Sequence, residues 1–381
     1  MAPTRKADAA DRAAPRSHSS DLYRFHRPKL RLDEAPHPLK RESQRCLQNL
    51  AAYRTPPQLA TLPFPRSRRA AVLVALFVGR QGDLYVLLSR RAATLRSYAG
   101  DTALPGGRVD PEDATIEDTA RREAFEEIGL PADKTKVPLL CVLEPYLAGA
   151  TTLVTPTLPK AAGGGQTQAL VQLLPVVVLI LDTTLRPILN AAEVHALFSH
   201  PLGAFLASTP PAAPHLRADT NAEAEAEAEQ AALELPYHTY FDMPWPHTST
   251  PAPAPARNAG PTAQDQDQSQ NERAVRMHRF LTGREAGGVK PVYGLTAAIL
   301  IRTALIGYAP RAPTFALAAP HQPSMGERIA HALRHGPGPA LCAAEGIDAE
   351  QAAAAWEACA IGKSGKKGRR GVGEWLRVVK L

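Results

Sequence analysis

The stretch that decides the fold is Leu104-Pro-Gly-Gly-Arg-Val-Asp-Pro-Glu-Asp-Ala-Thr-Ile-Glu-Asp-Thr-Ala-Arg-Arg-Glu-Ala-Phe-Glu-Glu-Ile-Gly-Leu130. Its Pro-Gly-Gly opening is typical of a tight loop whose backbone approaches a ligand closely. Asp113 or Thr115 can cap a helix after this loop, and Gly129 is placed to end it. Apolar residues recur every four positions along that helix and predict a buried stripe: Ile116, Ala120, Ala124 and Ile128.

Three glutamates share one face of this predicted helix. Glu123, Glu126 and Glu127 are spaced i, i+3 and i+4, so their carboxylates lie close together and repel one another. Arg122 can neutralise only part of that charge. Hard oxygen donors gathered in this way suit Mg²⁺ or Mn²⁺, which also bind phosphate oxygens. The pattern therefore predicts a divalent cation at the helix and a diphosphate substrate beside it.

The regions on either side of this stretch predict one α/β domain with long insertions. The apolar run at Ala70–Val78, a turn and the run at Leu84–Leu88 predict a β-hairpin. Further elements are expected as follows: strands at Leu139–Leu143, Leu153–Leu158, Leu173–Leu181 (which Pro175 is expected to shorten), Leu235–Phe241 and Arg276–Phe280, and helices at Arg41–Tyr53, Ala191–Phe198 and Gly294–Tyr308.

Composition places the boundaries of that domain. The chain has 36 prolines and 26 glycines among 381 residues, so much of its length is expected to be loop or disordered. We expect residues 1–65 to be a mostly disordered extension and residues 66–310 to form the domain. Low-complexity insertions are expected at about 161–170 and 209–272, and residues 311–381 form a C-terminal extension with a basic tail.

Several classes of protein are excluded by composition. The four cysteines are widely spaced with no CxxC pair, which excludes a disulfide scaffold and a cysteine-based zinc site. No apolar run reaches the roughly 18 residues of a membrane span. The net charge of +7 is modest, and few aromatic residues interleave the basic clusters, so we expect no nucleic-acid partner. Four histidines show no ligand pattern and are expected to be satisfied or exposed rather than metal ligands: His195, His200, His238 and His278.

The deciding stretch resembles the signature of Nudix hydrolases, Gly-x5-Glu-x7-Arg-Glu-U-x-Glu-Glu-x-Gly-U, in which U is bulky and apolar. Gly107, the Arg122-Glu123 pair, Glu126-Glu127 and Gly129-Leu130 match its fixed positions, with the small Ala124 at one U position. The acid before the helix is Asp113 rather than Glu, and eight residues rather than seven separate it from Arg122. This insertion leaves the role of Asp113 open.

The same insertion, together with an upstream motif, resembles the coenzyme A diphosphatase subgroup of that family. The upstream motif is Leu87-Leu-Ser-Arg-Arg-Ala92, followed by Arg96, Gly100 and Leu104-Pro-Gly-Gly107. Ser89 replaces the usual threonine, and Leu104 the usual phenylalanine. The segment Tyr293-Gly-Leu-Thr-Ala297 is also similar to the one that opens the subgroup's last helix.

The resemblance implies a fold and a metal site. The family fold is a mixed β-sheet sandwiched between α-helices, an α/β (α+β) class. Glu126 and Glu127 would ligate Mg²⁺ or Mn²⁺, Glu123 would complete the cluster, and the carbonyl of Gly107 could help. Arg122 would orient the glutamates through a salt bridge.

The catalytic base and the substrate contacts are implied less directly. Glu123 is one candidate for the base. Glu193 is another, and its alternative is an ordinary acid near the positive end of a helix dipole. Arg96 could bind the phosphates bidentately or serve as an ion pair of the fold, and Arg91 has the same two interpretations. Gly106 and Gly107 would approach the substrate through their backbone.

Three functions are therefore compared. The first is metal-dependent hydrolysis of coenzyme A or an acyl-CoA to 3′,5′-ADP and a 4′-phosphopantetheine product. The second is a Nudix diphosphatase acting on NADH, ADP-ribose or dinucleoside polyphosphates. The third is an inactive module that binds nucleotides or RNA. We expect an intracellular protein; the final Val379-Lys380-Leu381 partly resembles a peroxisomal signal, and the cytoplasm and mitochondrion are the other compartments considered.

Overall fold

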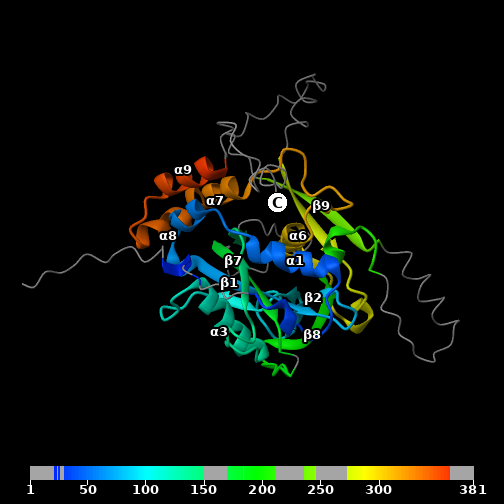
Figure 1. Ribbon diagram of the computed structural model, residues 1–381. Helices are drawn as coiled ribbons and strands as arrows, with labels where there is room; N and C mark the ends of the chain where they lie inside the picture. Colours follow the sequence, from blue (N-terminus) through cyan, green and yellow to red (C-terminus); the bar gives the residue numbers. More distant parts are fainter. Residues whose placement is uncertain are drawn as a thin grey trace, which may run out of the picture.

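A mixed β-sheet forms the centre of the described structure (Figure 1). The computed structural model describes residues 21–23, 25, 30–148, 170–182, 184–211, 236–245 and 273–360. The order along the main path is β3-β2-β1-β7-β5, with β4 on β1, β6 on β7 and β8 on β2. Only β1 and β7 pair in parallel among these strands. Their bounds are β1 Arg69–Val78, β2 Leu84–Arg91, β3 Thr102–Ala103, β4 Gly106–Arg108, β5 Leu139–Val142, β6 Tyr146–Ala148, β7 Val171–Ile180 and β8 Val194–Pro201.

Helices cover both faces of this sheet. Alternate residues of β1 point to opposite sides, as the pleat of a strand requires. Val72, Val74 and Leu76 pack in a cluster with α1 (Arg41–Ala52) and α6 (Gly294–Gly307). Ala71, Leu73 and Ala75 pack instead with α3 (Ile116–Ile128). The result is a sheet between two helical layers, which confirms the predicted fold class (Figure 1).

The remaining elements lie around these layers. A second, antiparallel sheet contains β9 (His238–Pro244), β10 (Ala274–Phe280) and β11 (Val292–Tyr293). Short helices are η1 Asp21–Tyr23, η2 Leu32–Glu34, α2 Pro57–Thr61, η3 Arg66–Arg68, η4 Leu202–Leu206 and η5 Glu285–Gly287. The C-terminal helices are α7 Met325–Arg334, α8 Gly338–Ala344 and α9 Ala349–Ala360. In the described ranges, no helix combines the length and the apolar character needed to cross a bilayer.

The predicted domain limits at residues 65 and 310 differ from the packed structure. Cys46, Leu47 and Leu50 of α1 are fully buried in the same cluster as α6. Beyond residue 310, α7 and α9 bury Trp356 and pack with Phe64. The two flanking regions therefore contribute to the core, because their apolar stripes cover sheet edges and faces that the central segment leaves exposed.

Two secondary-structure predictions were also wrong. The helix expected at Ala191–Phe198 is largely β8, whose buried residues alternate and which pairs with β2 along its length. This segment forms a strand despite its alanines, because its backbone forms hydrogen bonds with the edge of β2. Pro175 does not shorten β7: its carbonyl accepts from the Leu143 N–H, so its missing donor faces the gap between β5 and β6. The strand expected at Leu153–Leu158 lies outside the described residues.

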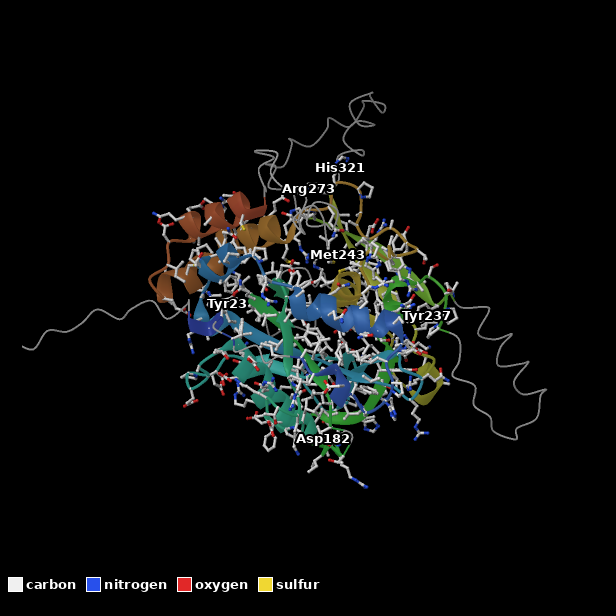
Figure 2. The ribbon with its side chains drawn as sticks, in the orientation of Figure 1. Tyr23, Asp182, Tyr237, Met243, Arg273 and His321 are labelled. Atoms are coloured by element: carbon white, nitrogen blue, oxygen red, sulfur yellow. The ribbon has the colours of Figure 1, made fainter. Side chains whose placement is uncertain are left out.

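Burial of His200 predicts a loss of stability in mild acid. Its Nε2 lies 2.8 Å from the hydroxyl of Tyr237, which Figure 2 labels. Burial, aided by Arg284, lowers the pKa of His200 from 6.5 to about 4. The unfolded chain binds a proton on His200 more tightly than the folded protein does. The contribution of neutral His200 to the free energy of unfolding is therefore complete above the unfolded pKa of 6.5 and is lost as the pH falls toward the folded pKa of about 4. Through this residue, the free energy of unfolding measured in urea should fall by about 2 kcal/mol between about pH 7 and about pH 5. The free energy of unfolding of His200→Gln should fall less than that of wild type over this pH range. An equal fall in the two proteins would contradict this prediction.

The crossing of α1 and α6 predicts that Gly307 tolerates no side chain. A Cβ at Gly307 would lie 2.3 Å from the Sγ of buried Cys46, whereas one at Gly287 would meet nothing within 4 Å. Overpacking of this kind costs about 1–3 kcal/mol of unfolding free energy, so Gly307→Ala should be destabilising. The matched Gly287→Ala should stay within about 0.5 kcal/mol of wild type in the same urea titration. Equal effects of the two changes would show that the helices can separate to admit the methyl group.

Candidate active site

The two glycines of the deciding stretch lie in β4, flat against β1. Gly106 is opposite Val72 and Gly107 is opposite Ala71. A Cβ on Gly106 would lie 2.3 Å from the carbonyl oxygen of Ala71, and one on Gly107 would lie 2.3 Å from a carboxylate oxygen of Glu123. Both positions therefore require glycine, one to pair with the sheet and the other to admit the glutamate.

The helix that carries the glutamates is capped at both ends. Thr115 accepts a hydrogen bond from the N–H of Asp118, whose carboxylate accepts from the Thr115 N–H, so the two form a capping box. Gly129 ends α3 with φ of 68°, in the left-handed region, and its N–H bonds to the carbonyl of Phe125. The cap is thus Thr115 rather than Asp113.

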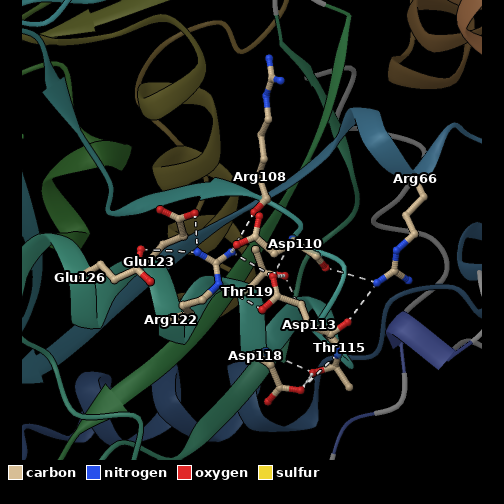
Figure 3. Close-up of polar contacts among 10 residues, drawn as sticks. All are labelled: Arg66, Arg108, Asp110, Asp113, Thr115, Asp118, Thr119, Arg122, Glu123 and Glu126. Carbon is tan, nitrogen blue, oxygen red and sulfur yellow. Dashed lines mark hydrogen bonds and ion pairs between the residues drawn. The ribbon is translucent and has the colours of Figure 1, made fainter.

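Arg122 is the centre of a polar network below the glutamates (Figure 3). Its Nε and Nη2 donate to the two oxygens of Asp113 at 3.1 and 2.9 Å. Its Nη1 donates to Glu123 at 3.0 Å and lies 3.5 Å from Glu126, while Nη2 also reaches the carbonyl of Arg108 at 2.9 Å. The guanidinium therefore connects the loop before the helix to two of the three glutamates.

Asp113 acts as the anchor of Arg122 in this network. Besides the arginine, it accepts hydrogen bonds from the hydroxyl of Thr119 at 2.8 Å and the N–H of Asp110 at 2.9 Å. Burial opposes its charge, but these hydrogen bonds, with Arg122 foremost, lower the pKa of Asp113 overall. The departure from the family signature thus has a structural account: the inserted loop brings the aspartate beneath the arginine.

The carboxylate of Glu127 is buried, and its pKa is shifted in the direction opposite to that of Asp113. It is only 4% exposed. Its pKa is raised to about 7, mainly by burial and also by Glu123 and Glu193, while Arg91 and a backbone hydrogen bond at Gly106 oppose the shift. Burial likewise raises the pKa of Glu123. The fold therefore brings the carboxylates of Glu123, Glu127 and Glu193 near one another, although Glu193 lies far along the chain.

The donor set fits a hard divalent cation in its chemistry. Glu127 is a buried carboxylate next to two others, so a cation would relieve their repulsion. Glu126 is instead exposed and points toward Arg122. Within the ranges that the structure describes, no three His, Cys, Asp or Glu side chains are grouped closely enough to hold a metal ion as they stand. The ligand roles of Glu123, Glu126, Glu127 and Gly107 therefore stay predictions.

A cavity of about 370 Å³ opens beside Gly106. Its walls come from the segment Tyr98–Leu104, from β6, from β10, from Tyr293–Thr296 and from α7. Arg91 lines it, whereas Arg96 is exposed and is not among the described residues of its wall. Sequence spacing could not choose between the two arginines, because the direction of each depends on where β2 ends.

One hydrogen-bond cluster holds two walls of this cavity together. Asp101 accepts from the Nζ of Lys290 at 2.5 Å and from the hydroxyl of Tyr293. The hydroxyl of Thr102 donates to the carbonyl of Lys290 at 2.5 Å. The upstream motif and the Tyr293 segment, which are far apart in sequence, are therefore fixed against each other.

Sequence reasoning missed three other residues of the wall. Tyr98 is 58% exposed and has φ of 56°, an uncommon backbone conformation for an aromatic residue. Arg276 comes from β10 and Arg328 from α7. No local motif surrounds either arginine, so only the tertiary fold reveals them.

Comparisons with known proteins agree with this geometry. Residues 67–152 match the NUDIX domain family. The peroxisomal coenzyme A diphosphatase 1 of Saccharomyces cerevisiae is 45% identical over 93 residues, covering 24% of this chain and 27% of that protein. The mitochondrial Nudix hydrolase 15 of Arabidopsis thaliana is 37% identical over 142 residues, covering 37% of this chain and 42% of that protein. The chain thus spans less than half the length of these relatives.

A solved structure is also similar. It is a Nudix hydrolase of M. smegmatis, 25% identical, with a TM-score of 0.26, and the match covers 36% of this chain and 73% of that one.

The network below the glutamates predicts different effects for two neighbouring aspartates. Asp113→Asn should lower the unfolding free energy at neutral pH by about 1–3 kcal/mol, because a buried, charge-assisted partner of Arg122 is lost. Asp110→Asn is the matched control: its carboxylate is half-exposed and 3.5 Å from Arg122, so about 0.5 kcal/mol or less is expected. Urea unfolding of both variants checks this, and comparable losses would remove Asp113 from its role as anchor.

Proposed function

We propose that this protein, whose residues 67–152 match the NUDIX domain family, is a Nudix hydrolase that cleaves the diphosphate bond of coenzyme A or a coenzyme A derivative. Water attacks one phosphorus, and the bridging oxygen leaves with the other phosphoryl group. The products are 3′,5′-ADP and 4′-phosphopantetheine or its acylated form. The partner is thus a small molecule, and neither a membrane nor a nucleic acid is part of the proposal.

One observation carries the choice of substrate. The upstream motif and the Tyr293 segment both resemble the coenzyme A diphosphatase subgroup, and parts of both line the same cavity: Arg91, Leu104 and Gly106 of the motif, and Tyr293–Thr296. The volume of about 370 Å³ is within the range of small-molecule sites. The name of the yeast relative, a coenzyme A diphosphatase, supports the same substrate.

The proposed reaction depends on Mg²⁺ or Mn²⁺. Glu123, Glu126 and Glu127 would hold the cation with their carboxylates, and the carbonyl of Gly107 would assist. When bound, such an ion lowers the pKa of water and offsets charge that develops on the phosphates.

The side chains around the cation have separate roles. Glu193 or Glu123 takes the proton of the attacking water; each is close enough to Glu127 to raise its pKa. Arg91 lines the cavity and lies near Glu127, so its guanidinium can bind diphosphate oxygens, and exposed Arg96 can reach the substrate from outside. Arg122 is a positioning residue, since its bonds go to Asp113 and Glu123.

We further propose a peroxisomal location, which the name of the yeast relative supports. The mitochondrial relative makes the mitochondrion the alternative. Imaging the full chain with a reporter fused to its N-terminus separates the two compartments and the cytoplasm.

The substrate panel is the direct test. Protein with Mg²⁺ or Mn²⁺ is given coenzyme A, NADH, ADP-ribose and diadenosine polyphosphates, and the products are separated by chromatography. Coenzyme A should give 3′,5′-ADP faster than the others are cleaved. Glu127→Gln should lose at least about 100-fold in kcat, since it removes a buried carboxylate from the centre of the site. The matched control, Glu112→Gln, changes an exposed acid of the preceding loop and should retain activity.

The alternatives give different results. Faster cleavage of another nucleotide would keep the hydrolase and reject coenzyme A as the substrate. Binding of nucleotides without any cleavage would favour a non-catalytic module.

A further inference from the structure

The cavity beside Gly106 contains a buried cation that no side chain in the described part of the chain neutralises. Arg328, on α7, is only 6% exposed and lines the cavity. Within the described structure its guanidinium makes no hydrogen bond and no ion pair, and its Nε is buried without a partner. Burial lowers the pKa of Arg328 to about 10, with Tyr146 the one neighbour that opposes the shift. A buried charge without a partner is costly, so it calls for a ligand.

The other charged groups of the described wall are already paired or lie elsewhere. Arg276 forms a bidentate pair with Asp242 at 2.7 Å and lies over the ring of Tyr240. Asp101 is neutralised by Lys290. Arg91 differs from Arg328 because it lies beside a carboxylate, that of Glu127. The cavity thus presents one guanidinium near Glu127 and, on α7, a second one that pairs with no described side chain.

The two arginines reach the cavity from different elements. Arg91 lies near Glu127, which bonds to the backbone of Gly106, whereas Arg328 lies near Tyr146 of β6. From β4 to β6 the strand order is β4-β1-β7-β6, so their neighbours are three strand spacings or about 14 Å apart. A ligand that carries a second anionic group, separate from the diphosphate, matches this arrangement.

We propose that Arg328 binds a phosphate monoester on the substrate's nucleotide, which in coenzyme A is the 3′-phosphate of the ribose. This assignment rests on the proposed function for the identity of the nucleotide. A guanidinium matches a phosphate because two N–H groups donate to two oxygens in parallel. The 3′-phosphate also projects from the same ribose that bears the diphosphate, so it can reach α7 while the diphosphate stays at α3.

Binding without turnover tests the site independently of catalysis. The full-length protein is titrated with 3′,5′-ADP and with 5′-AMP, which lacks the 3′-phosphate. Wild type should bind 3′,5′-ADP more tightly, and Arg328→Gln should weaken that binding about 10- to 100-fold, so that the two nucleotides become nearly equal. Arg328→Lys should recover part of the preference. Arg334→Gln, on the same helix but paired with Glu350 and Glu357, is the control and should keep it.

The melting temperature separates a binding role from a structural one. Because Arg328 has no partner to lose, Arg328→Gln should melt at the same temperature as wild type or higher in the absence of ligand. A lower melting temperature, together with an unchanged preference for 3′,5′-ADP, would mean that the residue is structural and would overturn the proposal. Equal binding of 3′,5′-ADP and 5′-AMP by the wild type would overturn it as well.

Kinetics then distinguish this proposal from the proposed function. If coenzyme A is cleaved, the ratio of kcat/KM for coenzyme A to that for dephospho-coenzyme A should fall toward one in Arg328→Gln. If coenzyme A is not cleaved but 3′,5′-ADP still binds through Arg328, the phosphate site stands and the proposed function fails. Wild type could instead prefer succinyl-CoA over coenzyme A, and Arg328→Gln could lose this preference alone. In that case Arg328 binds the carboxylate of the acyl group, and the phosphate assignment is rejected.

Discussion

The close contact between β4 and β1 is the constraint on which the site depends. Because Gly106 and Gly107 have no side chains, the loop pairs with the central strand and Glu123 can lie directly over it. The loop then feeds into α3 through the capped turn at Thr115, which fixes the rotation of the helix. That rotation buries Glu127 and leaves Glu126 exposed. The positions of the acidic side chains thus follow from backbone packing.

Charge is distributed unevenly along the cavity. At the α3 end, burial and neighbouring carboxylates raise the pKa of Glu127; at the α7 end, Arg328 is buried without a counter-ion among the described residues. Each arrangement is unfavourable in the free protein, and each becomes favourable when an ion or group of opposite charge is bound. Strain of this kind at a site is commonly maintained by the rest of the fold, here by the two helical layers that cover the sheet.

Much of the core could be predicted from the sequence, because its signals are periodic. The apolar run at β1 and the four-residue repeat in α3 report burial directly, and the Gly-Gly loop with its glutamates is contiguous. The helix expected at Ala191–Phe198 was wrong because pairing with β2 outweighed local preference. The choice between Arg91 and Arg96 depends on side-chain direction at the end of a strand. Arg328 has no local signal, since its setting is created by Tyr146 on a distant strand.

The hydrogen bonds from Asp101 to Lys290 and Tyr293 have a consequence for how such a protein can diversify. They attach a wall supplied by the C-terminal half to the segment that matches the NUDIX family. Under the proposed function, the hydrolytic glutamates and the wall that selects the ligand would come from different stretches of one chain. Changes in β10, in the Tyr293 segment or in α7 would then alter which molecule is accepted while the glutamate helix stays intact. The two parts would thus vary independently although they belong to one packed fold.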